Sequence, residues 1–116
     1  MHELALAKDI VSTVIDVADI KESEEIKAVY ITVGEGRDIV PPLFRALFRR
    51  FAEGTMLEHA ELNFNRKPMR VKCNNCGLVH PVDVRDRKTW GCPNCDSRNH
   101  ELYSGMEFYI DYFEVA

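Results

Sequence analysis

The first hydrophobic pattern along the chain is that of an amphipathic helix. Between residues 4 and 19, apolar side chains recur every three or four positions, and polar side chains lie between them. A second helix is expected from Pro41 to about Glu53, because proline is tolerated in the first turn of a helix and Gly54 is a natural stop. The apolar face of this second helix is predicted to consist of Leu43, Phe44, Leu47, Phe48 and Phe51.

Three other segments have the composition of β-strands. Residues 27–33 are rich in β-branched and aromatic side chains and end at a Gly-Glu-Gly turn. Residues 60–65 alternate apolar and polar side chains, and residues 108–113 alternate with both faces partly apolar. A cysteine-rich segment lies between these last two strands. This order predicts an α+β fold in which two helices pack on a small three-stranded sheet and a ribbon is inserted before the final strand.

The chain is expected to divide into two modules. Residues 1–68 together with residues 104–116 form the expected α/β module, and residues 69–103 form the ribbon. With 116 residues in total, the chain is too short to give each module a self-sufficient hydrophobic core. We therefore expect the ribbon to be stabilised by an internal cross-link.

All four cysteines of the chain lie in this ribbon, as two Cys-x2-Cys pairs separated by fifteen residues: Cys73, Cys76, Cys92 and Cys95. Two tight pairs at this separation bring four thiolates to one metal ion, and tetrahedral sulfur coordination suits Zn2+. Four protein ligands leave no position for a catalytic water, which predicts a structural zinc site. A rubredoxin-like iron site is the next alternative. A redox-active dithiol is disfavoured, because the pairs are embedded in Asn, Gly and Pro.

Charge and hydropathy restrict the classes of function. A formal net charge of -4 at pH 7 disfavours a general phosphate-backbone binder, which usually has a basic excess. No run approaches the roughly 20 apolar residues that span a bilayer, and no secretory leader pattern is found, so we expect a cytoplasmic protein. No nucleophile with a base and an orienting acid stands out, which predicts a protein without catalytic activity.

Six motifs carry a resemblance to a known family. They are Met-His-Glu at residues 1–3, Val-Gly-Glu at 33–35, Glu-Gly-Thr at 53–55, Ala-Glu-Leu at 60–62, the two cysteine pairs, and Gly-Met-Glu at 105–107. Together they span nearly the whole chain, and they resemble the HypA family of hydrogenase nickel-incorporation proteins. The resemblance implies a nickel metallochaperone that works with a HypB-type GTPase to load nickel into the large subunit of nickel-iron hydrogenase. In some organisms it also implies a role in urease maturation.

The resemblance also implies where the nickel ion binds. The family places nickel on its N-terminal residues, so His2 is the predicted ligand, with Met1 and Glu3 as further candidates. The imidazole and backbone nitrogen of residue 2, with the amine of Met1, offer nitrogen donors in a square plane, which suits Ni2+. Some relatives supply a carboxylate from the loop before the second helix, where Asp38 is nearest. Apart from the resemblance, Glu3 is explained by the helix dipole and Asp38 by a turn before Pro41.

The alternative is a zinc-ribbon adaptor that binds nucleic acid or protein and has no role with nickel. Between residues 70 and 100, six Lys and Arg side chains stand against three Asp side chains, and Trp90 offers a stacking surface. The acidic remainder of the chain argues against nucleic acid, and basic residues equally suit an acidic protein partner. His59, His80 and His100 are left out of the nickel site. An exposed final strand with apolar faces would favour a homodimer.

Overall fold

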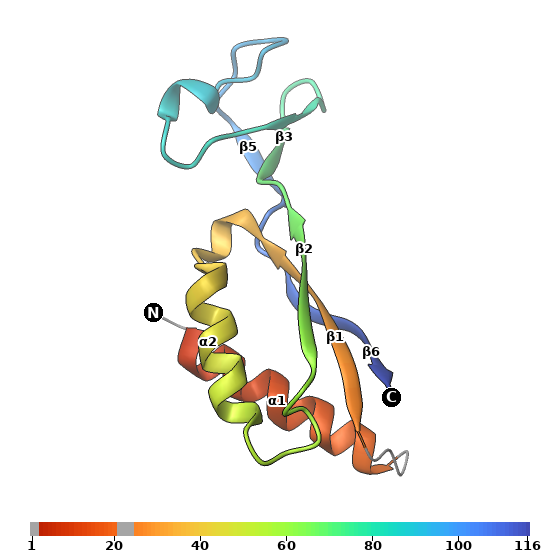
Figure 1. The fold of residues 1–116 in the computed structure, drawn as a ribbon. Helices are drawn as coiled ribbons and strands as arrows, with labels where there is room; N and C mark the ends of the chain where they lie inside the picture. The colour runs from red at the N-terminus through yellow and green to blue at the C-terminus, as the bar shows by residue number, and fades with distance from the viewer. Residues whose placement is uncertain (1–2, 21–24) are drawn as a thin grey trace. The chain divides into compact units, whose positions relative to one another are not determined.

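The computed structural model describes residues 3–20 and 25–116 (Figure 1). The helices in this part of the chain are α1 (Glu3–Ile20) and α2 (Pro41–Ala52). The strands are β1 (Ile26–Gly34), β2 (Glu61–Lys67), β3 (Arg70–Cys73), β4 (Val79–Pro81), β5 (His100–Ser104) and β6 (Phe108–Val115). This order confirms the α+β fold with a ribbon before the final strand. The ribbon contains a three-stranded sheet of its own.

The chain forms two compact units. The first comprises residues 1–31, 39–65 and 109–116, and the second comprises residues 32–38 and 66–108. One sheet has the strand order β2-β1-β6, and the other has the order β4-β3-β5. None of the helices in the described ranges is long and apolar enough to cross a membrane.

The core of the first unit lies where α1 and α2 pack against each other and α2 meets β2. The buried stripe of α1 has helical spacing and consists of Ala7, Ile10, Val11, Val14 and Ala18. On α2, Phe44 is fully buried and meets the ring of Phe64 edge to face, with 5.8 Å between the ring centroids. Arg45 donates a hydrogen bond to the carbonyl of Leu62, and its guanidinium lies 4.7 Å from the centroid of Phe64. These contacts anchor α2 to β2.

The last strand of the chain lies beside the first. The N–H of Ala116 donates to the carbonyl of Glu25 at 3.0 Å, and the ring of Tyr112 stacks on that of Tyr30 with 4.4 Å between centroids. Residue numbers rise along β1 as they fall along β6, so the two strands are antiparallel. The strand order places β1 in the centre of its sheet and β6 at an edge.

The buried residues of α2 differ from those predicted. Phe44, Phe48 and Ala52 are at most 1% exposed, whereas Leu43 is 48% exposed and Leu47 is half-buried. The five predicted apolar positions cover an arc of about 140° at about 100° per residue. The first unit covers only the side of that arc centred on Phe44 and Phe48. The side that carries Leu43 faces outward.

Glycines allow two segments of the second unit to cross at close range. The N–H of Gly36 donates to the carbonyl of Gly105 at 2.7 Å. A Cβ atom on Gly34 would lie only 2.0 Å from the same carbonyl oxygen, and Gly105 has a φ of +117°. A side chain at Gly34 has no room, and one at Gly105 would be strained, so the crossing depends on glycine.

Candidate metal centres

The structure brings the four predicted cysteines together in the second unit. Their Sγ atoms all lie within 4.8 Å of one another, and the pairs Cys73–Cys95 and Cys76–Cys92 are 3.5 Å apart. None of the four forms a disulfide. Zn–S bonds of about 2.3 Å in a tetrahedron give S–S separations of about 3.8 Å. The donor set therefore fits a tetrahedral metal ion. No other cluster of three or more His, Cys, Asp or Glu within the described residues lies this close.

The two Cys-x2-Cys loops have the same backbone structure. In each loop, the residue after the second cysteine donates its N–H to the carbonyl of the first cysteine. Gly77 donates to Cys73 at 2.9 Å, and Asp96 donates to Cys92 at 2.8 Å. Both donors are left-handed, with φ values of 80° and 66° respectively. The glycine is expected at such a position, whereas nothing in the sequence pattern marked Asp96 as its counterpart.

Strand pairing holds the first loop against the segment that follows the second loop. Cys73, at the end of β3, is paired with His100 at the start of β5. The next residue, Asn74, donates its backbone N–H to the carbonyl of Asn99 at 2.9 Å. The side chains of these two asparagines are also hydrogen-bonded, at 3.0 Å. The cysteine spacing predicts that the loops meet, but it does not predict this asparagine pair.

The four thiols differ in exposure and in acidity. Cys73 and Cys92, the first members of each pair, are 1% exposed, whereas Cys76 is exposed. A hydrogen bond from the Asn94 side chain, helped by the backbone N–H of Leu78, lowers the pKa of Cys76 to about 6. Burial raises the pKa of Cys92 to about 11. A metal ion must displace the proton of each thiol that it binds, and burial makes this displacement harder at Cys92 than at Cys76.

Two histidines of the ribbon have a buried ring nitrogen without a hydrogen-bond partner in the described part of the chain. His80, on β4, is 5% exposed and has no partner for Nε2. His100, on β5, has none for Nδ1. Both residues belong to the second unit, while His59 is an exposed residue of the first.

Comparison with known proteins identifies the family. A family model described as "Hydrogenase/urease nickel incorporation, metallochaperone, hypA" matches residues 1–115. The chain belongs to the HypA family. The hydrogenase maturation factor HypA of Moorella thermoacetica is 32% identical over 98% of each chain. That of Pyrococcus furiosus is 31% identical and covers 95% of this chain and 92% of its own.

Two solved HypA structures have the same fold. The solution structure of the Ni metallochaperone HypA from Helicobacter pylori has a TM-score of 0.67 and covers 99% of this chain and 97% of its own. A second solution structure of a HypA protein has a TM-score of 0.74 and covers 100% and 97%. Both are 22% identical to this chain, so they support its fold alone.

The nickel ligands predicted for this HypA chain lie at its start and in one loop. Met1 and His2 lie outside the described residues. Glu3 begins α1 and is 5% exposed. Asp38 is exposed and ends a short 3-10 turn with a φ of 56°, a conformation that Asp tolerates better than most residues. Glu3 belongs to the first unit and Asp38 to the second.

Trp90, the stacking candidate of the adaptor interpretation, is engaged within the ribbon of this HypA chain. Its Nε1–H donates to the carbonyl of Asp83 at 2.8 Å. The guanidinium of Arg87 lies 5.9 Å from the centroid of its ring. One face of the indole is thus next to a side chain of the same unit, which weighs against its use as a platform for a nucleic-acid base.

Proposed function

We propose that the chain is a nickel metallochaperone that delivers Ni2+ for maturation of nickel-iron hydrogenase, with urease as a second candidate recipient. The observation that carries the proposal is the family match over residues 1–115, which includes the N-terminal Met-His-Glu and the four clustered cysteines. One chain then offers a closed set of four sulfur ligands and a distinct N-terminal set of nitrogen donors. In this proposal the protein carries an ion and is not an enzyme.

The cysteine cluster is proposed to hold Zn2+ for structure. Apart from Cys73 and Cys92, the buried hydrophobic side chains of the second unit are only Val33 and Val71, and every residue of this unit is described. So small a core needs a cross-link, and a structural zinc site supplies one. Four protein ligands complete a tetrahedron, so zinc has no open position for exchange. The cluster therefore suits a resident ion rather than cargo.

The N-terminal residues are proposed to hold nickel as exchangeable cargo. His2 contributes its imidazole, Met1 contributes its amine, and Glu3 and Asp38 are further candidates. The imidazole must be neutral to bind a metal ion, so nickel affinity should fall as the pH drops through the range in which histidine is protonated. Few protein ligands and an open coordination sphere favour transfer of the ion to a partner.

A HypB-type GTPase and the large subunit of nickel-iron hydrogenase are the proposed partners. A cytoplasmic location follows from this partnership. A homodimer is also proposed, because β6 lies at a sheet edge and Tyr109, Tyr112 and Val115 on it are about half exposed.

A nickel titration tests the proposed function. Tag-free protein that starts at Met1 is first checked for bound zinc by elemental analysis. It is then titrated with Ni2+ in a calorimeter beside a His2→Ala variant. We expect wild type to bind close to one equivalent and the variant to lose this binding. His59→Ala is the matched control, because His59 is an exposed histidine of the first unit.

Two results would contradict the proposal. If His2→Ala binds nickel as wild type does, the site is not at the N-terminus. If wild type binds no nickel, the zinc-ribbon adaptor becomes the better interpretation. Binding of nucleic acid with a steep salt dependence would then separate a nucleic-acid adaptor from a protein adaptor.

A further inference from the structure

Helix α2 leaves one edge of its apolar arc exposed. Leu43, Ala46, Leu47 and Arg50 recur at i, i+3, i+4 and i+7, so they share one face of the helix. Leu43 is 48% exposed, Ala46 and Arg50 are exposed, and Leu47 is half-buried. We call these four residues the outer face of α2. Val40, directly before the helix and 51% exposed, extends it.

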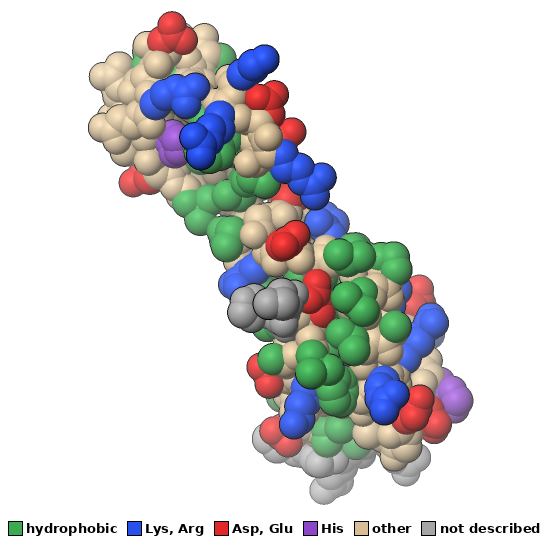
Figure 2. Space-filling model, turned by 90° about the vertical axis from the view of Figure 1, so that its left-hand side faces the viewer, with side chains coloured by type: hydrophobic (Ala, Val, Ile, Leu, Met, Phe, Trp, Pro, Cys, Tyr) green, Lys and Arg blue, Asp and Glu red, His purple; other side chains and the backbone are tan. Residues whose placement is uncertain are grey.

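The adjoining part of the same apolar arc is already buried. Phe44, Phe48 and Ala52 are at most 1% exposed and pack in the first unit. A surface helix normally buries its apolar face and exposes a polar one, whereas α2 leaves the Leu43 edge of its apolar arc exposed. In Figure 2, hydrophobic side chains gather on the face of the molecule that this view presents, over the first unit. An exposed apolar edge of this kind is a candidate interaction surface.

The charge of α2 is opposite to that of the unit that contains it. The helix has three arginines and no carboxylate, whereas the first unit as a whole has twelve Asp and Glu against six Lys and Arg. Arg45 is turned inward to Leu62 and Phe64. For Arg49 and Arg50, the described residues provide no ion-pair partner. Arginines in a last turn also offset the helix dipole, but this role does not account for the apolar residues beside them.

We propose that the outer face of α2 docks an amphipathic helix of a partner protein, one that presents apolar side chains next to carboxylates. Apolar residues at i, i+3 and i+4 on one helix face, here Leu43, Ala46 and Leu47, are part of the pattern by which helices bind one another. Arg49 and Arg50 favour a segment with carboxylates beside its apolar stripe. A second copy of α2 fits less well, because it would bring further arginines and no carboxylate.

The choice of partner rests on the proposed function. The docked protein would be the one that gives nickel to this chain or takes nickel from it.

Binding measurements with substituted α2 test the proposal. The purified HypB-type GTPase and the hydrogenase large subunit serve as two separate probes for wild type, Leu43→Glu and Arg50→Glu. For at least one probe, we expect Leu43→Glu to weaken binding tenfold or more. Arg50→Glu should weaken it and reduce its dependence on salt. Both positions are exposed, so thermal unfolding should be unchanged.

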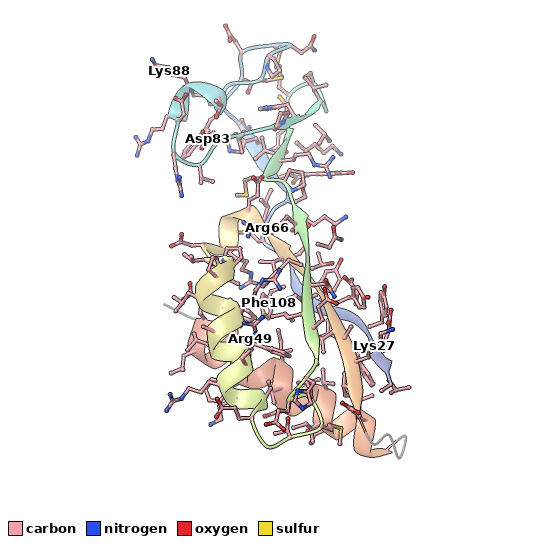
Figure 3. All side chains as sticks on the ribbon, viewed as in Figure 1. Lys27, Arg49, Arg66, Asp83, Lys88 and Phe108 are labelled. Carbon is pink, nitrogen blue, oxygen red and sulfur yellow. The ribbon has the colours of Figure 1, made fainter. Side chains whose placement is uncertain are left out.

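Two control variants carry the same chemical changes elsewhere. Lys27→Glu reverses an exposed charge on β1, whereas Arg49 and Arg50 are on α2 of the same unit (Lys27 and Arg49 are labelled in Figure 3). Leu102→Glu places a carboxylate at a 51% exposed leucine of β5. Both should bind the probes within about twofold of wild type. Nickel stoichiometry is measured on every variant. Leu43→Glu should keep it, so a failure of the docking proposal is distinguished from a failure of the nickel proposal.

Other outcomes would overturn the docking proposal. If neither Leu43→Glu nor Arg50→Glu changes the affinity for either probe, this face is not the docking site. Hydrogen exchange that shows a protected partner segment without carboxylates removes the stated partner chemistry. Sedimentation that shows a dimer of this chain abolished by Leu43→Glu assigns the face to a second copy instead.

Discussion

The glycine crossing in the second unit gives the sharpest stability prediction. At Gly34, a Cβ atom would lie 2.0 Å from the carbonyl oxygen and 2.1 Å from the carbonyl carbon of Gly105. Both are backbone atoms, so no side-chain rotation relieves the clash. Contacts of a Cβ below 3.0 Å are essentially never seen, so Gly34→Ala must push the segments about 1 Å apart.

That displacement breaks hydrogen bonds that the crossing depends on. The N–H of Gly36 donates to Gly105 and the N–H of Gly34 donates to Glu107, both at 2.7 Å. An added 1 Å takes each beyond hydrogen-bond range, at about 1 kcal/mol per bond. Overpacking strain in the folded state destabilises it by about a further 1–3 kcal/mol. Alanine also reduces the conformational entropy of the unfolded chain, which offsets about 0.4–1 kcal/mol of this loss. We expect Gly34→Ala to lower the free energy of unfolding by about 2–4 kcal/mol.

Urea unfolding, followed by circular dichroism, measures this effect against two matched variants. At Gly91 a Cβ meets nothing within 4 Å, so Gly91→Ala should change stability by less than about 0.5 kcal/mol. At Gly36 the nearest atom is the flexible Met106 Sδ at 2.6 Å, so Gly36→Ala should cost an intermediate amount. The order Gly34, Gly36, Gly91 is the test. If Gly34→Ala is as stable as Gly91→Ala, the inference from the close approach is wrong.

Three further predictions concern the second unit. Gly77 and Asp96 occupy the same left-handed position of their loops. Thermal unfolding should therefore show Gly77→Ala to be less stable than wild type by about 1 kcal/mol, and Asp96→Gly to be as stable as wild type or more stable by up to about 1 kcal/mol. Destabilisation by Asp96→Gly would contradict the shared geometry. The pKa of Glu107 is lowered by a hydrogen bond from its own backbone N–H and by a second one from the backbone N–H of Gly105. The ionised carboxylate therefore contributes to stability above the ordinary pKa of 4.5, and this contribution is lost as the pH falls through the lowered pKa. Glu107→Gln should therefore flatten the stability profile measured by urea unfolding below about pH 5, and an unchanged slope would argue against these bonds. Cys73→Ala, or removal of metal by a chelator, should collapse the dispersed NMR amide signals of the second unit and preserve those of α1 and α2; loss of both sets would show that the units do not fold independently.

The sequence predicted those features of the fold that depend on local periodicity. Helical periodicity placed both helices, and alternation placed β2 and β6. Composition placed β1, because β-branched and aromatic side chains suit a strand that is buried along most of its length. The pattern could not say which part of a wide apolar arc is covered. Leu43 and Phe44 are equally apolar neighbours, yet one is 48% exposed and the other fully buried. That difference is decided by which surfaces α1 and β2 present to the helix.

Cysteine spacing predicted which residues meet in the ribbon but not how the loops are held. The pairs converge as expected, to Sγ separations within 4.8 Å. The Asn74–Asn99 pair and the left-handed Asp96 have no signature at the level of composition, because they depend on backbone conformation and strand register. The close approach of Gly34 to Gly105 joins residues 71 positions apart, and no local pattern reports such a distance.

The position of the ribbon in the chain has a consequence for how the molecule folds. The strands β2 and β6 belong to one sheet, but 40 residues separate Lys67 from Phe108, so the sheet is incomplete until the whole ribbon has been synthesised. Pairing of Arg70 with Ser104 shortens the path between those strands to fewer than ten residues. Each halving of a loop saves about 0.6 kcal/mol of closure entropy, so an assembled ribbon favours docking of β6 by about 1.2–1.5 kcal/mol. A metal ion that closes the ribbon early would therefore speed completion of a sheet that supplies none of its ligands.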